Sequence, residues 1–289
     1  MPKGLYGLAL DQSSLVLAAP AKGGLDKLTE VTWEAGTLLE ALEKLGPLLK
    51  EAAAAAGLRG GACAVALAPP HVILRRLTFP VLPPEALRLN LEAELAQFLP
   101  SAPESYIIRY KLLNREAGKL TLLAAALEKQ AAAALERAVS SAGFRLKAID
   151  CAENAWEKLL RLLTRRGVPD LDNAAILTLQ PGGHSYITVL HRGRFALSRA
   201  LPAGAEEPER LAGEASAMLE YAYYSEGRVK LSHLYLAGSA ADMAGLAELL
   251  SEALSLPVSP IQGILNGLGP QESLNQGAAA FAATLREVK

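Results

Sequence analysis

The sequence has only two cysteines, 5% aromatic residues and a formal net charge of -1 over 289 residues. So few cysteines exclude a disulfide scaffold, and the balance of acidic and basic residues excludes a field that attracts nucleic acid or an anionic bilayer. The longest uncharged runs, 173–191 and 253–271, contain proline, glycine and amide residues, so neither predicts a membrane span. The remaining composition, with 51% hydrophobic residues, is typical of a globular protein of about two domains.

Motifs that carry chemistry are also missing. No Gly-x-Gly-x-x-Gly follows a predicted strand and no phosphate-binding Gly-Lys-Ser/Thr loop occurs, so neither common class of nucleotide site is predicted. The sequence has no Gly-x-Ser-x-Gly elbow, and its cysteines lack the context typical of a thiol protease. The four histidines are scattered over different predicted elements, without metal-site spacing. We therefore expect no catalytic residues, no cofactor and no metal.

The order of the predicted elements indicates an α/β protein made of two similar halves. Strand-like hairpins at 5–19 and 175–199 each begin a half and are each followed by a helix and another strand. The first of these helices is expected over 34–56, with a break at Gly46-Pro47. A polar connector at 167–170 is the predicted boundary between the halves.

A compact β-α-β-β-α unit is expected over residues 70–145. Its first strand, 71–80, is predicted to pair with a buried strand at 62–68. Pro83 and Pro84 then open an amphipathic helix. The apolar residues expected on one stripe of that helix are Leu87, Leu91, Leu95 and Phe98.

The most specific stretch of the sequence is 75–104, RRLTFPVLPPEALRLNLEAELAQFLPSAPE. It has an arginine, an apolar strand that ends in proline, a proline-started acidic helix, and an ending from Glu94 to Pro100. With the stretches at 142–156, 191–204 and 234–260, it resembles the family of the type IV pilus assembly protein PilM. That family is actin-like and is related to the division protein FtsA and to the cytoplasmic domain of the secretion protein GspL.

The resemblance implies an actin-like fold, which is a duplicated, ribonuclease H-like α/β fold of two lobes with a nucleotide cleft between them. The first lobe is expected over 1–170, with an FtsA/PilM-type subdomain inserted at about 70–145. The second lobe is expected over 171–289. Its small subdomain is reduced, because little sequence separates the strand ending near Pro202 from the helix beginning near Glu207.

The first nucleotide-binding hairpin of the family is altered in this sequence. Actin-like ATPases hold phosphates with glycine-containing hairpins, whose backbone N-H groups approach the anion, and with an Asp that organises Mg²⁺ or water. An ungapped comparison places Ala9 at the Asp position, Asp11 at the Gly position and Val16 at a Lys position. A carboxylate at Asp11 also repels a phosphate, by about 1 kcal/mol or more at ~4 Å.

The second hairpin and the adenosine-side turn are altered as well. Leu179 stands at the acidic position and Pro181 at the glycine position, where proline also removes a backbone donor. The turn that is Gly-Gly in the family is Gly238-Ser239 here. The comparison therefore predicts that the protein is not an enzyme and does not bind ATP as the family does.

The resemblance implies a cytoplasmic scaffold of a type IV pilus machine, peripheral to the inner membrane. It is expected to bind the short cytoplasmic tail of a PilN-like inner-membrane protein and to link that protein to the motor ATPase, with no nucleic acid and no direct membrane insertion. Residues near the inserted subdomain are the candidates for the partner surface: Arg76, Phe79, Leu82, Glu94 and Phe98. Two alternatives stay open, a GspL-like domain of a type II secretion system and a divergent actin-like ATPase.

Overall fold

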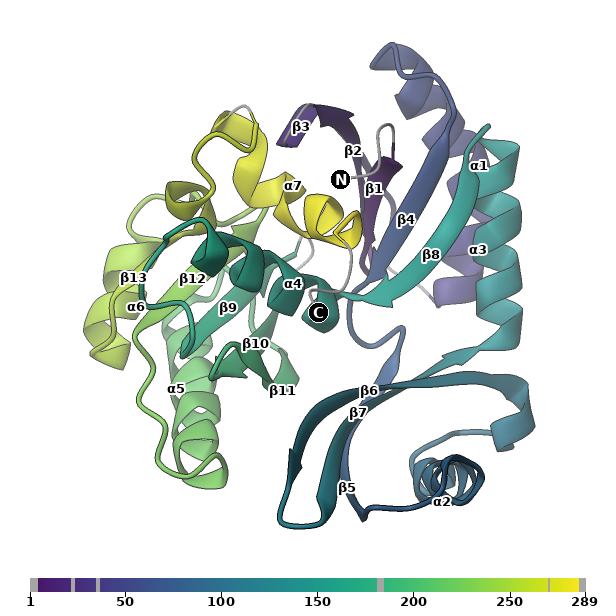
Figure 1. The fold of residues 1–289 in the computed structure, drawn as a ribbon. Coiled ribbons are helices and arrows are strands. Elements are labelled where there is room, and N and C mark those ends of the chain that lie inside the picture. The colour runs from purple at the N-terminus through teal and green to yellow at the C-terminus, as the bar shows by residue number, and fades with distance from the viewer. Residues whose placement is uncertain (1–4, 22–23, 35–36, 181–184, 270, 286–289) are drawn as a thin grey trace.

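The computed structural model describes residues 5–21, 24–34, 37–180, 185–269 and 271–285. Its strands form two five-stranded sheets and one three-stranded sheet. Helices α4 (Ala152–Arg165) and α7 (Gln271–Ala283) lie between the two larger sheets, and the small sheet extends from one end of the molecule (Figure 1).

The first sheet has the strand order β3-β2-β1-β4-β8. Its strands are β1 (Leu5–Leu10), β2 (Ser14–Ala21), β3 (Gly24–Thr32), β4 (Ala62–Leu67) and β8 (Arg145–Cys151). Successive side chains of a strand point to opposite faces, so Leu8 and Leu10 face one core while Ala9 faces another. Helices α1 (Leu38–Ala55) and α3 (Lys129–Ser141) pack side by side on the outer face.

The second sheet has the order β11-β10-β9-β12-β13. Its strands are β9 (Ala174–Leu179), β10 (Ser185–His191), β11 (Arg194–Leu201), β12 (His233–Gly238) and β13 (Val258–Pro260). Helices α5 (Pro208–Ser225) and α6 (Leu246–Leu254) cover its outer face, and a short 3-10 helix, Ile261–Ile264, follows β13. Each large sheet thus has three antiparallel strands and then two parallel ones in the same order, which confirms the predicted duplication.

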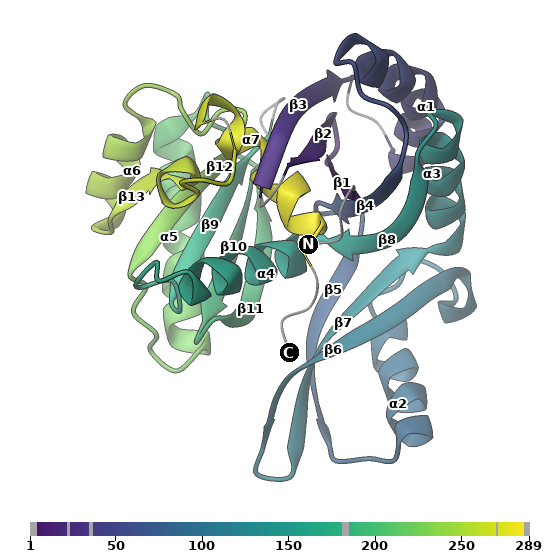
Figure 2. The same cartoon turned by 45° about the horizontal axis from the view of Figure 1, so that its top comes forward.

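The third sheet has the order β5-β7-β6 and forms a separate layer (Figure 2). It consists of β5 (Ile73–Pro80), β6 (Tyr106–Glu116) and β7 (Lys119–Glu128), with a 3-10 turn, Pro103–Ser105, before β6. Helix α2 (Pro84–Ala96) covers one face of this sheet through Leu87, Leu91 and Leu95. The predicted apolar stripe is therefore present for these three residues.

The surroundings of this sheet differ from the sequence expectations. Strand β5 pairs antiparallel with β7 and not with β4, because β1 and β8 already occupy both edges of β4. Helix α3, expected within the compact unit 70–145, packs against α1 on the first sheet, since Ala131, Leu135 and Val139 face that core. Phe98 lies beyond the end of α2 and is 41% exposed, so it does not belong to the buried stripe.

Helix α1 is continuous through Gly46-Pro47, where a break was expected. Thr37 begins the helix with a capping box, in which its hydroxyl accepts from the N-H of Glu40 while the Glu40 carboxylate accepts from the N-H of Thr37. Burial of Leu45 and Leu49 holds the helix together across the proline. At Gly46 the two helices approach closely, because a Cβ there would displace the Ser141 hydroxyl of α3.

A buried carboxylate joins the third sheet to both lobes. Glu157 on α4 is fully buried, and its oxygens accept from Lys111 of β6 at 2.9 Å and from the N-H of Phe195 of β11 at 3.0 Å. Arg194 and Arg161 lie within 3.2 and 3.7 Å of the same carboxylate. Since a buried charge is stable only when it is paired, these contacts fix the position of the third sheet.

In the part of the chain that the structure describes, no helix combines the length and the apolar character that crossing a bilayer requires.

Candidate functional site

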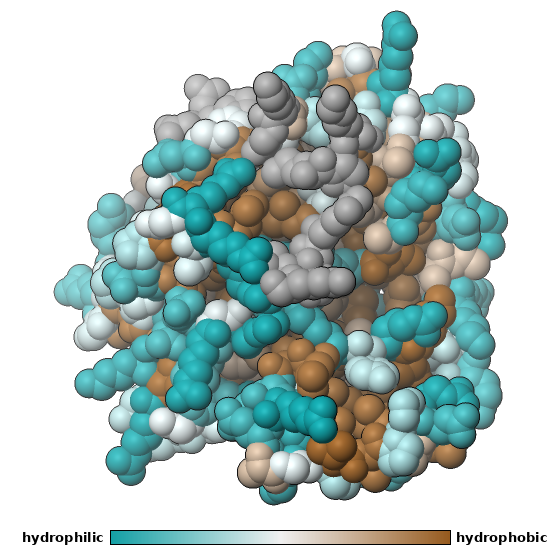
Figure 3. Space-filling model, viewed as in Figure 1, coloured by the Kyte–Doolittle hydropathy of each residue, from teal (hydrophilic) through white to brown (hydrophobic). Residues whose placement is uncertain are grey.

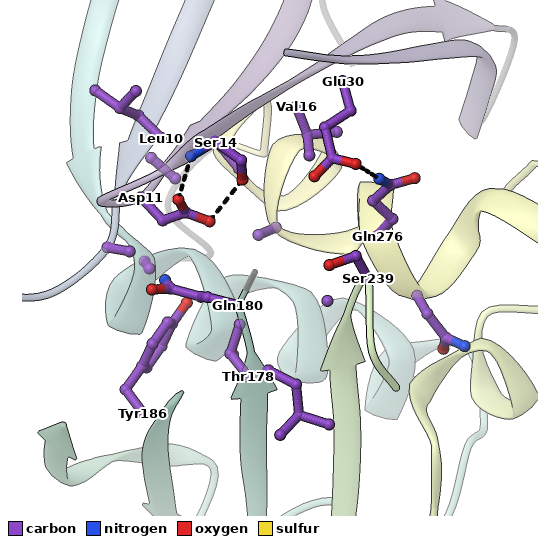
Figure 4. Close-up of a pocket in the computed structure, with 18 of the residues that line it drawn as sticks. Leu10, Asp11, Ser14, Val16, Glu30, Thr178, Gln180, Tyr186, Ser239 and Gln276 are labelled. Atoms are coloured by element: carbon purple, nitrogen blue, oxygen red, sulfur yellow. Dashed lines mark hydrogen bonds between the residues drawn. The ribbon is translucent and has the colours of Figure 1, made fainter. Parts of the chain in front are cut away.

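A cavity of about 40 Å³ lies between the two large sheets (Figure 4). It brings together the altered nucleotide-motif positions that the structure describes, which are Ala9, Asp11, Val16, Leu179 and Ser239. Pro181 lies outside the described residues. These residues come from two separate hairpins and a turn of the sequence, and the fold brings them to one place.

The wall of the cavity on the first sheet is a row of side chains in register. Ala9 of β1 pairs with Val16 of β2, and Val16 pairs with Glu30 of β3. Residues directly opposite on adjacent strands point to the same face, so this wall carries a methyl group, an isopropyl group and a carboxylate. Neither Ala9 nor Val16 supplies a polar group that could hold Mg²⁺ or a phosphate.

Asp11 closes the turn between β1 and β2. Its carboxylate accepts from the N-H groups of Ser13 and Ser14 at 2.8 and 2.6 Å and from the Ser14 hydroxyl at 2.7 Å. Burial raises the pKa of Asp11, although these hydrogen bonds act in the opposite direction. The side chain thus uses the turn N-H groups that a glycine-containing hairpin would present to a phosphate.

Glu30 is a second acid at this cavity, and the sequence analysis did not select it. Its carboxylate accepts a short hydrogen bond from the Gln276 amide of α7 (Figure 4). Burial, and then the charge of Asp11, raise the pKa of Glu30. The site therefore presents two carboxylates, which disfavour any anion placed between them.

The floor of the cavity is a close-packed junction of the two lobes. Trp156 of α4 is fully buried, and its indole N-H donates to the Tyr186 hydroxyl of β10 at 3.4 Å. Both belong to one core cluster that also includes residues of β2, β4, β12 and α7. Sites for small organic ligands typically have volumes of about 300–1,000 Å³, so this cavity is much smaller than such sites.

The turn after β12 keeps one of the two glycines of the family pattern. Gly238 has a φ of 96°, and a Cβ there would collide with the carbonyl oxygen of Leu179. Ser239 lines the cavity at the position of the second glycine. Among the described residues, no cluster of His, Cys, Asp and Glu side chains is able to hold a metal ion.

The candidate partner residues occupy different environments. Phe79 is 7% exposed and packs in the core of the third sheet, and Leu82 is half-buried against the same cluster. These positions favour a packing role for both residues. Glu94 is exposed on α2, where it accepts from the Gln97 amide at 3.3 Å. Arg76 and Phe98 line one groove together.

A groove of about 280 Å³ separates the inner face of the third sheet from the first lobe. We call it the docking groove. Its wall on the third sheet contains Ile107 and Arg109 of β6 and Leu127 of β7, while Ile149 and Asp150 at the end of β8 lie opposite. Sequence reasoning missed these residues because the third sheet was expected to include α3 and to pair with β4.

Comparisons with known proteins give a structural match but no sequence match. No family model and no curated protein matches this sequence. A solved structure described as the PilM-PilN type IV pilus biogenesis complex has a TM-score of 0.74 at 18% identity and covers 97% of both chains. A protein from Bacteroides thetaiotaomicron, described as having an actin-like ATPase fold and unknown function, has a TM-score of 0.53 at 13% identity, covering 96% of this chain and 95% of that one.

This chain has the actin-like fold. A third similar structure, the ethanolamine utilization protein EutJ from Carboxydothermus hydrogenoformans, has a TM-score of 0.54 at 13% identity and covers 98% of this chain and 90% of that one. At such identities the similarity shows a common fold and does not transfer an activity. The actin-like architecture therefore occurs here with a small cavity, lined by apolar and acidic side chains, between its lobes.

Proposed function

We propose that this protein is a non-catalytic scaffold of a type IV pilus assembly machine. In this proposal it binds the cytoplasmic N-terminal tail of a PilN-like inner-membrane protein, is held at that membrane through this partner, and links it to the motor ATPase. The observation that carries the non-catalytic part is the cavity of about 40 Å³, where the Asp11 carboxylate accepts from the turn N-H groups and Glu30 adds a second acid to the wall. The choice of partner is supported by the similarity to the PilM-PilN complex.

The docking groove suits an extended peptide. Strand β6 is an edge of the third sheet, so its outer backbone groups lie outside the ladder formed with β7. Ile107 and Tyr110 of this strand, which line the groove, are 37% and 47% exposed. Apolar surface is visible over the region of the third sheet in Figure 3. Peptides that bind as an added strand combine main-chain hydrogen bonds with apolar pockets for alternate side chains. Here the edge of β6 offers the hydrogen bonds, and the groove over the adjoining face of the sheet offers the apolar pockets.

The polar groups of the groove supply anchors. Asp150 is held by Lys158 at 2.7 Å and by the Asn154 amide, so its carboxylate has a fixed position. Arg109 is exposed on the opposite wall. A short tail with an apolar side chain flanked by charged residues therefore matches the groove in both shape and charge.

The test is binding of a fluorescent peptide with the sequence of a PilN-like tail, measured by anisotropy. We expect saturable binding to the wild type and at least about tenfold weaker binding to Ile107→Glu, because a carboxylate would be placed against the apolar wall. The matched control is Leu89→Glu on α2, where the leucine is 60% exposed and does not line the groove. Absence of peptide binding to the wild type would contradict the proposed function. An equal loss of affinity in both variants would instead contradict the docking groove as the binding site.

A further inference from the structure

A second groove, of about 360 Å³, lies between β5 of the third sheet and β11 of the second sheet. We call it the arginine groove. It adjoins the docking groove at Val72, but the other residues that line the docking groove, on β6, β7, β8 and α4, do not line it. Figure 2 shows β5 and β11 on adjacent parts of the fold, at the place where the third sheet approaches the second lobe.

The groove follows the edges of two strands. Strand β5 is an outer strand of the order β5-β7-β6, and β11 is an outer strand of the order β11-β10-β9-β12-β13. Consecutive residues of both line the groove, from 72 to 76 and from 195 to 200. A groove over the face of a sheet would be lined by every second residue, so this pattern indicates a slot along the two edges. Among the described strands, each of these two has a ladder partner on one side only.

Arginine side chains give the walls of this slot a positive charge. Arg75 lies over the Phe98 ring, with its guanidinium carbon 4.4 Å from the ring centroid. Arg199, on the opposite wall, is exposed, and its guanidinium group makes no hydrogen bond or ion pair with the described residues. Arg76 is paired with Glu226 at 2.5 Å, which ties this end of β5 to the end of α5.

The acids near the slot do not cancel this charge. Glu226 lies outside the groove lining and is already neutralised by Arg76. Glu153 is on the floor and is only 3% exposed, and burial raises its pKa to about 7. A ligand on the walls therefore meets the charges of Arg75 and Arg199 before it meets any acid.

We infer that the arginine groove binds an acidic, extended segment of a protein partner by strand addition. Such a segment would exchange main-chain hydrogen bonds with an open strand edge and place its carboxylates beside the guanidinium groups. Because Arg76 is already paired with Glu226, the guanidinium groups that face such a segment are those of Arg75 on β5 and Arg199 on β11. This partner contact goes beyond the proposed binding of a tail in the docking groove, and it gives the scaffold a second attachment point.

The probe is a short fluorescent peptide of alternating glutamate and threonine, with a lysine-threonine peptide as the charge-reversed control. We expect the acidic peptide to bind the full-length protein and the lysine peptide not to bind. Arg199→Glu should weaken binding about tenfold. The matched control is Arg137→Glu on α3, an exposed arginine outside the groove lining, which should leave binding unchanged.

Three results would overturn this inference: no binding of the acidic peptide, equal binding of both peptides, or equal weakening by both variants. The unfolding midpoint of each variant shows whether a loss of binding is due to misfolding. Both arginines are exposed, so each variant should keep the unfolding midpoint of the wild type. Competition with the PilN-like tail peptide distinguishes the two grooves. Simultaneous binding of both peptides supports two separate sites. Displacement of one peptide by the other would contradict the claim that the sites are separate.

Discussion

Asp11 shows how one side chain converts an open loop into a closed turn. The N-H groups of Ser13 and Ser14 donate to its carboxylate, which makes them unavailable to an external anion. Glu30 extends the acidic surface from the neighbouring strand, and its contact with Gln276 joins β3 to α7. At the residue scale the site is therefore organised for hydrogen bonds within the protein rather than for a phosphate ligand.

We expect the stability of the protein to depend on pH through one buried acid, Glu153. Glu153 is almost completely buried, and burial raises its pKa from the ordinary 4.5 to about 7. The folded state therefore favours the protonated form, so this stabilisation is complete below about pH 4.5 and is lost as the pH rises through about 7. A shift of this size corresponds to about 3 kcal/mol of unfolding free energy.

We predict that Glu153→Gln increases the unfolding free energy relative to the wild type at about pH 8, by up to about 3 kcal/mol, and has little effect at about pH 4. Denaturant unfolding at both pH values measures this difference. Glu136→Gln on α3 is the control, because Glu136 is exposed and should give no pH-dependent change. A Glu153→Gln variant with the same relative stability at both pH values would contradict the assignment.

At the scale of elements, helix α7 determines how closely the lobes approach each other. It contacts β1, β2 and β4 of the first sheet and β12 of the second. Gly7 on β1 lies directly against its backbone, and a Cβ at Gly7 would collide with the carbonyl oxygen of Ala280. Small residues along α7, such as Ala280 and Ala282, are fully buried and permit this distance.

We predict that Gly7→Ala lowers the unfolding free energy by about 1–3 kcal/mol, because the added methyl group forces α7 away from β1. Gly213→Ala is the matched control on α5, where a Cβ meets nothing within 4 Å. An exposed helical glycine gains about 0.5–1 kcal/mol on this change, so the control should be slightly more stable than the wild type. Equal effects of the two substitutions, measured by urea unfolding, would argue against the close contact.

The elements also show which parts of the fold the sequence could predict. The duplicated hairpins were readable because their strands are short apolar runs around polar turns, and Leu87, Leu91 and Leu95 marked α2 by their spacing. Strand β3, with the sequence GLDKLTEVT, was missed because it is an edge strand with several exposed polar side chains. Glu30 was missed with it, since only the pairing with Val16 brings that residue to the cavity.

Helix α7 was missed for a different physical reason. Its sequence, QESLNQGAAAFAA, has many small residues and no wide apolar stripe. Its position depends on close contact with both sheets, which is a tertiary property. The docking groove was likewise not predictable, because it depends on how the third sheet sits against β8 and α4.

At the scale of the whole molecule, the two lobes of the actin-like fold are packed together around a small cavity. One core cluster extends from the first sheet through α4 and α7 to the second sheet, and Glu157 ties the third sheet to this assembly. The third sheet offers grooves on two sides. This arrangement is the physical basis for the proposed scaffold role.

The most direct test of this account is a calorimetric titration of the protein with Mg-ATP. We predict no saturable heat, because the cavity is about 40 Å³ and is lined by the carboxylates of Asp11 and Glu30. Binding of the PilN-like tail peptide to the same sample shows that the protein is folded and active in its proposed role. Saturable binding of Mg-ATP at micromolar concentration, with the rise in melting temperature that such binding requires, would contradict the account.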